Sequence, residues 1–153
     1  MAAARPRVLL TSCAARPAVP LALMRRVARG TLRAVRAPSG CFSVAFVDGP
    51  AMRRLNRRHL GHDCVTDVLS FDLRRRGTRR GPVELLGEVI IAPSVARRQA
   101  RRFGQTYAHE LARYVVHGVL HWAGYDDHAP AARRRMVARQ ERLLAQLLKG
   151  TRS

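Results

Sequence analysis

The chain has few acidic residues, few cysteines and no long apolar run. Its 153 residues include 10 Asp and Glu against 29 Lys and Arg. The three cysteines, Cys13, Cys41 and Cys64, form no Cys-x-x-Cys pair. Their spacing excludes a disulfide scaffold and a thiolate zinc site, and it favours a reducing compartment. No segment approaches the roughly 18 apolar residues of a membrane-spanning helix, so we expect a soluble cytoplasmic protein without a membrane partner.

The excess of basic residues predicts an anionic partner. The formal net charge is +19 at pH 7, and all but one of the basic residues are arginine. A field of this sign attracts polyanions, and contacts with phosphates gain free energy from counterion release. We expect nucleic acid as the partner, ahead of an acidic membrane surface. The first 47 residues contain no acid, which is also typical of an organelle transit peptide, but RVLLTS has the pattern of a strand within the domain.

The length predicts a single domain with one core. Hydrophobic periodicity predicts strands over 8–11 and 41–47, and a hairpin of strands 65–73 and 85–93. Helices are expected over 21–35, 48–61, 92–104, 106–124 and 130–150. The loop of the hairpin carries five arginines, interpreted as a solvated loop, with a phosphate contact as the alternative.

Several helix ends carry capping residues. Asp48 and Ser94 are expected N-caps, because a short side-chain oxygen accepts a free backbone N–H at this position. Gly61 and Gly124 are expected to end their helices, since glycine readily adopts the left-handed conformation. Glu110 lies in the first turn of its helix, where we expect an exposed or capping carboxylate.

Two histidines, His117 and His121, are four residues apart in the expected helix over 106–124. Side chains at this spacing project from one face of a helix, about one turn apart, so both imidazoles can bind the same ion. The alternative is a pair of core histidines that hydrogen-bond to carbonyl groups.

A turn beyond this helix offers a third ligand. The helix is expected to end at Gly124, and the chain then turns back through YDDH, which brings His128 or Asp127 toward the same ion. A third ligand from a turn that follows a helical pair is typical of catalytic zinc sites, which keep a fourth position for water.

Such a zinc site favours hydrolysis. The ion lowers the pKa of its bound water from 15.7 to about 7 and polarises a phosphoryl or carbonyl oxygen. Zinc peptidases have the motif HExxH, in which the Glu is the general base, and here that position is Gly118. Glycine within a helix costs roughly 1 kcal/mol relative to alanine, which indicates a close approach to the backbone there. A phosphodiester substrate therefore fits this basic chain better than a peptide.

The stretch HGVLHWAGYDDH is similar to the HGxLHxxGYDH signature of the YbeY-type endoribonucleases, which are bacterial rRNA maturation factors. Three further segments resemble motifs of that family in the expected order. LNRRHLGHDCVTDVLSF resembles the segment that ends in TDVLSF, LGEVIIAPSVARRQA resembles LGDIVIxPxxAxxQA, and ELARYVVHGVLH matches the helix that leads into the metal site. The clearest resemblance covers 55–128, and it predicts one YbeY-like domain over 1–153.

The resemblance implies an α+β fold in which a small mixed four-stranded sheet packs with helices and a metal site lies at the end of a central helix. It implies one Zn²⁺ bound by His117, His121 and the histidine that closes the signature. The implied activity is metal-dependent, single-strand-specific RNA cleavage in rRNA processing, at the 3′ end of 16S rRNA, and in ribosome quality control. The implied partners are ribosomal RNA and the small ribosomal subunit.

The chain departs from the signature at the third ligand, because it has GYDDH where the family has GYDH. Asp127 occupies the customary spacing and His128 follows it. We predict His128 as the ligand, since the turn can absorb one residue and imidazole suits zinc beside two others. Asp127 is the alternative, because carboxylate oxygen binds zinc at about 2.0 to 2.2 Å. Asp126 and the displaced Asp127 are then expected to orient the ligands by accepting a ring N–H.

A second departure is Leu60, where many members of the family have an arginine implicated in activity. Leucine cannot stabilise the charge that develops on a phosphate. Arg57 and Arg58 are nearby candidates for RNA contacts, and the alternative is that they are solvated helix arginines.

Three functions follow from these residues. The first is the metal-dependent endoribonuclease. The second is a non-catalytic zinc-containing factor that binds RNA or the ribosome, which Leu60 favours. The third is a zinc peptidase-like hydrolase, which Gly118 disfavours.

Overall fold

The computed structural model describes residues 5–61, 66–74 and 84–150, which form an α+β fold. The described ranges contain five helices and four strands in the order that the periodicity predicts. The elements are β1 (Arg7–Ser12), α1 (Leu21–Ala34), β2 (Cys41–Phe46), α2 (Gly49–Leu60), β3 (Val68–Asp72), β4 (Leu85–Ile91), α3 (Pro93–Phe103), α4 (Tyr107–Trp122) and α5 (Pro130–Leu147).

The sheet is mixed and has the strand order β1-β2-β4-β3. The pairs β1–β2 and β2–β4 are parallel, whereas β3 and β4 form the expected antiparallel hairpin, with Val68 opposite Ile91. The tip of the hairpin, with most of its arginines, and Cys64 lie outside the described residues. Along β2 the side chains of Phe42, Val44 and Phe46 are fully buried, because alternate residues of a strand point to the same face of the sheet.

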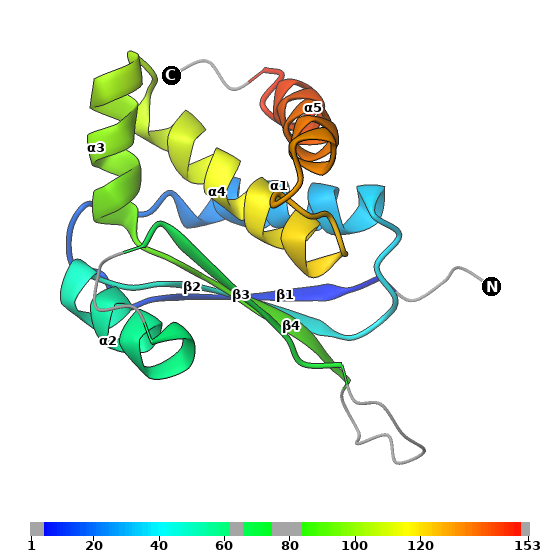
Figure 1. The fold of residues 1–153 in the computed structure, drawn as a ribbon, viewed down its shortest axis with the longest axis horizontal. Helices are drawn as coiled ribbons and strands as arrows, with labels where there is room; N and C mark the ends of the chain where they lie inside the picture. Colours follow the sequence, from blue (N-terminus) through cyan, green and yellow to red (C-terminus); the bar gives the residue numbers. More distant parts are fainter. Residues whose placement is uncertain (1–4, 62–65, 75–83, 151–153) are drawn as a thin grey trace.

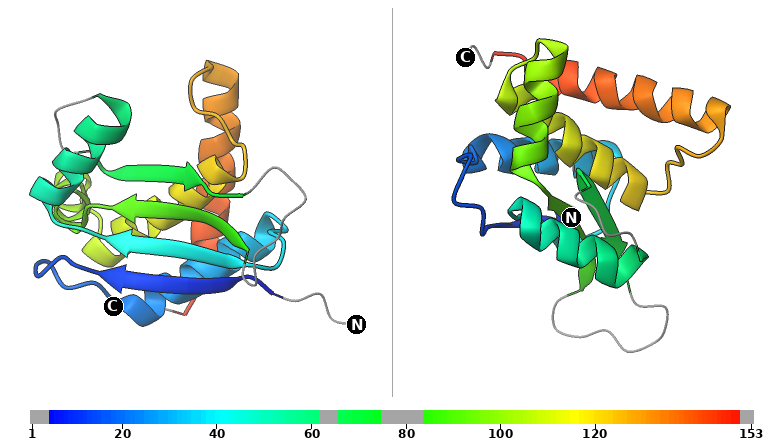
Figure 2. Two further views of the ribbon diagram at one scale, coloured as in Figure 1. Left: turned by 90° about the horizontal axis from the view of Figure 1, so that it is seen from below. Right: turned by 60° about the vertical axis from the view of Figure 1, so that its left-hand side comes forward.

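Helices cover one face of the sheet, and α4 lies at the centre of this layer (Figure 1). It contacts α1, α3 and α5 as well as β3 and β4. Helix α2 lies on the other side of the sheet, as two further views show (Figure 2). Over the described ranges, no helix has the length and apolarity that a membrane span requires.

Helix α4 approaches the sheet most closely at Gly118. A Cβ atom built on this residue would lie 2.5 Å from Val89 Cγ1 of β4, and Ser70 Oγ donates a hydrogen bond to the Gly118 carbonyl at 3.0 Å. One turn on, Trp122 Nε1 donates to the Leu86 carbonyl at 2.9 Å. These contacts confirm the close backbone approach predicted at Gly118 and fix the end of α4 on the sheet.

Most of the predicted helix ends are confirmed. Asp48 caps α2, because its Oδ1 accepts the Ala51 N–H at 2.8 Å. Gly61 ends α2 with φ 71°, and Gly124 follows α4 with φ 106°. Both glycines adopt the left-handed conformation that residues with a Cβ atom adopt at a cost.

The N-cap predicted at Ser94 is wrong. Helix α3 begins at Pro93, its N-cap is Ala92, and no side chain caps it. Proline suits the first turn because its φ is already helical and its missing N–H would have no partner there. The Ala92 N–H bonds to the Asp67 carbonyl at 3.1 Å, so the contact with the segment before β3 places the start of the helix two residues earlier.

Candidate metal centre

Helix α4 holds His117 and His121 near its C-terminal end. The helix begins at Tyr107, and its N-cap is Thr106, whose Oγ1 accepts the His109 N–H at 3.2 Å. Its apolar residues and Gly118 face the core, whereas the side chain of His117 is 36% exposed and His121 is exposed. Because packing fixes the helix on the sheet, the two histidines are held in place while they remain accessible.

A hydrogen-bond chain from α5 orients His117. The buried Gln140 accepts at Oε1 from His117 Nδ1, at 2.9 Å, and its Nε2 donates to Glu141 Oε1 at 3.3 Å. A carboxylate only accepts hydrogen bonds, so this contact fixes which end of the Gln140 amide faces His117. Nδ1 must then carry the ring proton, and the lone pair of His117 lies on Nε2, where a metal ion can bind.

Asp127 faces the free nitrogen of His117. Its Oδ2 lies 4.0 Å from His117 Nε2. Two ligands of a tetrahedral zinc ion lie roughly 3.4 Å apart, given metal–ligand distances of about 2.0 to 2.2 Å. An unprotonated imidazole nitrogen and a carboxylate at this separation therefore fit a divalent cation between them after a small movement.

The turn after α4 gathers further ligand atoms. Atoms of Asp126, Asp127 and His128 all lie within 4.8 Å of one another, close enough for one ion. Asp126 Oδ1 accepts the His128 N–H at 2.9 Å, and this bond lowers the pKa of the Asp126 carboxyl. Arg133 Nε donates to the Asp127 carbonyl at 2.9 Å and ties the turn to α5.

Asp127 lies close to both His117 and His128. His117 is paired with Asp127, whereas the His128 side chain is 87% exposed, with its Nε2 3.9 Å from Asp126 Oδ1. Among the described residues, the three predicted histidines do not form a group whose ligand atoms all lie within 4.8 Å. The identity of the third ligand stays a prediction.

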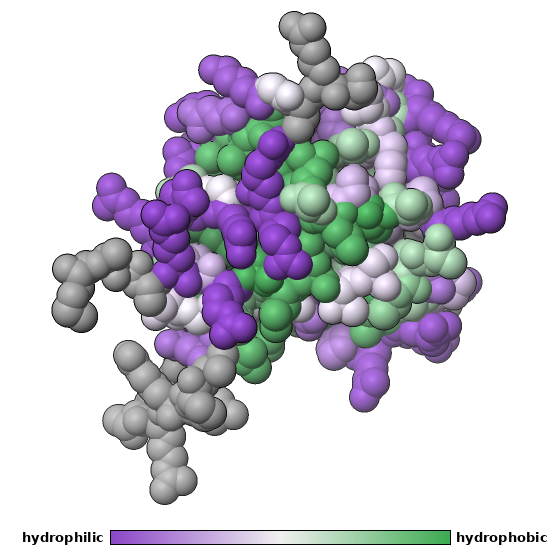
Figure 3. All heavy atoms as spheres, turned by 180° about the vertical axis from the view of Figure 1, so that it is seen from behind, coloured by the Kyte–Doolittle hydropathy of each residue, from purple (hydrophilic) through white to green (hydrophobic). Residues whose placement is uncertain are grey.

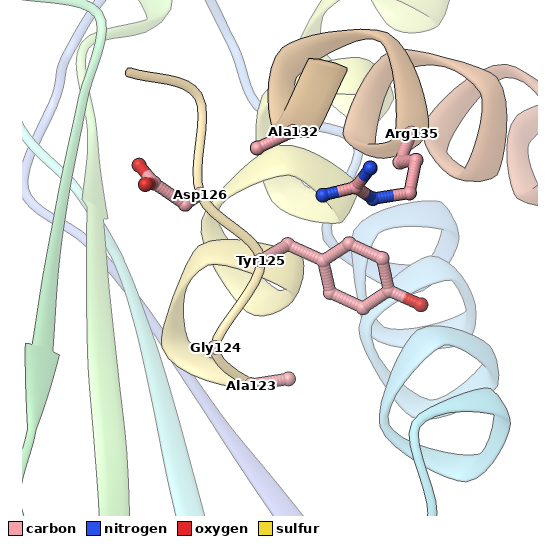
Figure 4. Close-up of a pocket in the computed structure, with 6 residues that line it drawn as sticks. All are labelled: Ala123, Gly124, Tyr125, Asp126, Ala132 and Arg135. Atoms are coloured by element: carbon pink, nitrogen blue, oxygen red, sulfur yellow. The ribbon is translucent and has the colours of Figure 1, made fainter. Parts of the chain in front are cut away.

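A pocket of about 290 Å³ lies beside this turn (Figure 4). Tyr125 and Arg135 point to one side of the turn, and the Asp126 carboxylate points to the other. The pocket is lined by Ala123, Gly124, Tyr125, Asp126, Ala132 and Arg135.

Glu110 is buried, so the expectation of an exposed or capping carboxylate is wrong. Only 5% of the residue is exposed, and it forms an ion pair with Arg113. Arg113 also binds Glu141 of α5 at 2.9 Å. Burial lowers the pKa of Arg113, but the contacts with both carboxylates outweigh it and leave the pKa raised. The ion pair of Glu110 and Arg113 could have been predicted from the sequence, because residues three apart on a helix are neighbours. No local pattern predicts the contacts of Gln140 or Glu141, which come from another helix.

The predicted RNA contacts, Arg57 and Arg58, are exposed on α2. This helix lies on the side of the sheet away from α4 (Figure 1). Leu60 ends the same helix and is 57% exposed.

Comparison with known proteins gives one consistent family. The family model described as Endoribonuclease YbeY matches residues 20–148. The Endoribonuclease YbeY of Moorella thermoacetica is 44% identical over 109 residues, which are 67% of this chain and 70% of that protein. The protein of the same description from Myxococcus xanthus is 46% identical over 107 residues, which are 68% of this chain but only 35% of that longer protein.

The fold has a solved counterpart. A solution structure of a Thermotoga maritima protein aligns with a TM-score of 0.62 and 23% sequence identity, over 92% of this chain and 89% of that chain. This likeness supports the architecture, and the sequence matches supply the family. From both the family model and its relatives, the chain belongs to the YbeY endoribonuclease family.

Proposed function

We propose that this protein is a metal-dependent endoribonuclease that cleaves single-stranded RNA in rRNA processing, including maturation of the 16S rRNA 3′ end, and in ribosome quality control. The observation that carries the proposal is the family match over 20–148, a range that contains His117 and His121 of α4. The net charge of +19 supports a polyanionic substrate. The whole of 1–153 is proposed as one domain that acts in the cytoplasm on the small ribosomal subunit.

The proposed cofactor is one Zn²⁺ bound by His117, His121 and a third ligand from the following turn. His128 is the proposed third ligand because imidazole suits zinc, and Asp127 is the alternative because it lies next to His117. When bound, zinc supplies an acidic water and polarises a phosphoryl oxygen. In this scheme, Gln140 holds the His117 ring in the ligating orientation, and arginines, with Arg57 and Arg58 as candidates, hold the RNA phosphates.

A zinc peptidase fits this geometry poorly. The general base of such enzymes occupies the position of Gly118, where even a Cβ atom would lie 2.5 Å from Val89 Cγ1. A carboxylate has no room there and could not reach a substrate on the exposed side of the helix.

The test combines metal analysis with cleavage assays. We expect the purified protein to contain zinc and to cut single-stranded RNA, but neither duplex RNA nor peptides. His117→Ala and His121→Ala should lose both metal and cleavage, whereas His59→Ala, which removes an exposed histidine of α2, should keep both. Cyclic phosphate at the fragment ends would identify the RNA 2′-OH as the nucleophile. Metal binding without RNA cleavage would favour the non-catalytic RNA-binding factor, which the exposed Leu60 supports.

The third ligand is assigned by a second comparison. If His128 is the ligand, His128→Ala lowers zinc affinity more than Asp127→Ala does, measured by competition with a chelator. The reverse order assigns the position to Asp127, whose Oδ2 lies 4.0 Å from His117 Nε2.

A further inference from the structure

Five arginines line a second pocket, of about 600 Å³, far along the chain from the candidate metal centre. It is formed where β1 begins and where α1 ends. The lining residues are Arg5, Pro6, Arg7, Arg29, Arg33, Arg36 and Ala37. We name this site the arginine pocket. On the face seen from behind, hydrophilic side chains gather where α1 ends and β1 begins (Figure 3).

Among the described residues that line the arginine pocket, every charged one is an arginine, so none of them is an acidic counterpart. Two arginines elsewhere do have acidic partners: Arg74 pairs with Asp72 at 2.8 Å and Arg113 with Glu141 at 2.9 Å. Within the described ranges, no ion pair involves an arginine of the pocket.

Helix stability explains only part of this cluster. Arg33 lies in the last turn of α1, where a cation interacts favourably with the C-terminal end of the helix dipole. That effect does not reach Arg7, which begins β1, or Arg5, which lies two residues before it. Two separate elements thus bring guanidinium groups to one cavity at a cost in mutual repulsion, which a bound anion would remove.

The guanidinium groups that line the arginine pocket favour phosphate as the ligand. A guanidinium group forms bidentate hydrogen bonds with phosphate oxygens and keeps its charge at any physiological pH. The volume of about 600 Å³ is within the usual range of ligand sites, roughly 300 to 1,000 Å³, so it admits more than a single small anion.

The arginine pocket and the candidate metal centre lie toward opposite edges of the sheet. The pocket includes the start of β1, which is one edge strand, whereas α4 contacts β3 and β4 at the other side. With strands spaced about 4.8 Å apart, β1 and β3 are separated by roughly 14 Å. A ligand of the pocket is therefore distinct from a group bound at His117.

We propose that the arginine pocket binds backbone phosphates of single-stranded RNA away from the bond that is cut, and so holds the strand on the protein. The proposal rests on the proposed function for the identity of the polyanion. Binding at the arginine pocket does not depend on the RNA sequence, because the contacts are with phosphates.

The test is equilibrium binding of a fluorescent single-stranded RNA, measured by anisotropy in the presence of EDTA so that cleavage does not interfere. Arg29→Ala with Arg33→Ala should weaken binding about tenfold or more. It should also flatten the plot of log affinity against log salt by about 1.4, at about 0.7 per lost phosphate contact. The matched control, Arg134→Ala with Arg142→Ala, removes two exposed arginines of α5 and should weaken binding less than threefold.

Equal losses in the two double variants would overturn the proposal, because the effect would then be one of net charge. A second double variant, Arg5→Ala with Arg7→Ala, alters the opposite wall of the pocket. It is used in place of Arg29→Ala with Arg33→Ala if thermal melting shows that the first double variant is unfolded. A titration with inorganic phosphate followed by ³¹P NMR separates the sources of phosphate. If the variants no longer bind inorganic phosphate but keep the RNA affinity of the wild type, the pocket is a site for free anions. This outcome would reject RNA as its ligand.

The outcomes for the two proposals are distinguishable. If the wild type cuts RNA, and the pocket variants bind RNA as well as the control does, the arginine-pocket proposal is rejected and the endoribonuclease proposal stands. If the pocket variants bind RNA more weakly but the wild type cuts no RNA with any metal added, the arginine-pocket proposal is supported and the endoribonuclease proposal is rejected.

Discussion

At the residue scale, the orientation of His117 depends on a side chain from another helix. Gln140 is 6% exposed, and its Oε1 accepts a hydrogen bond from the Nδ1–H of His117. This leaves Nε2 of His117 free to bind a metal. Contacts of this kind fix the tautomer and ring orientation of metal ligands, and their loss typically lowers metal affinity 10- to 100-fold.

We therefore expect Gln140→Met, which keeps the volume but removes the acceptor, to lower zinc affinity about 10- to 100-fold. Chelator competition measures the change, and Gln146→Met, an exposed position of the same helix, is the matched control. Unchanged affinity in Gln140→Met would mean that His117 does not depend on this contact or is not a ligand.

Gly118 is the second residue whose identity matters. Val89 leaves no room for a Cβ atom, so Gly118→Ala should destabilise the fold by about 1 to 3 kcal/mol, despite the better helix propensity of alanine. Urea unfolding measures the loss. Adding Val89→Ala should recover part of it, because the two changes share one contact; additive losses would contradict the clash.

At the element scale, Arg113 and Glu141 join α4 to α5. Burial raises the pKa of Glu141, but hydrogen bonds from Arg113 and Gln140 outweigh it and hold the pKa below its ordinary value of 4.5. A carboxyl group with a lowered pKa in the folded state stabilises the protein above its unfolded pKa, and this contribution is lost as the pH falls through the folded value.

Glu141→Gln should therefore unfold at lower urea than the wild type at about pH 7, and the difference should disappear as the pH falls below 4.5 and through the lowered pKa of the carboxyl group. Urea titrations at several pH values give both curves. A gap of constant size at every pH would show that the variant acts through packing and not through charge.

At the scale of the whole molecule, the net charge of +19 opposes compactness. Salt screens repulsion between exposed charges, with a Debye length of about 8 Å at physiological ionic strength. Thermal unfolding should therefore shift to higher temperature between about 20 and 300 mM NaCl. The shift should be smaller in the Arg134→Ala, Arg142→Ala protein, whose net charge is 19 − 2 = +17. A melting temperature that falls with salt would mean that ion pairs outweigh repulsion.

Sequence alone determined the order of the strands and helices and most helix ends, as at Asp48 and Gly61, because periodicity and capping depend on residues a few positions apart. It also predicted the glycine contact at 118, although not its partner. Tertiary packing decided that the N-cap of α3 is Ala92 instead of Ser94. The pairing of His117 with Gln140, 23 positions away, was likewise set by packing.

Tertiary packing also decided the burial of Glu110, the side of the 126–128 turn that faces His117, and the meeting of β1 and α1 arginines around one pocket. Each of these depends on how elements distant in sequence dock, and side chains far apart along the chain leave no local pattern from which their distance in space can be predicted.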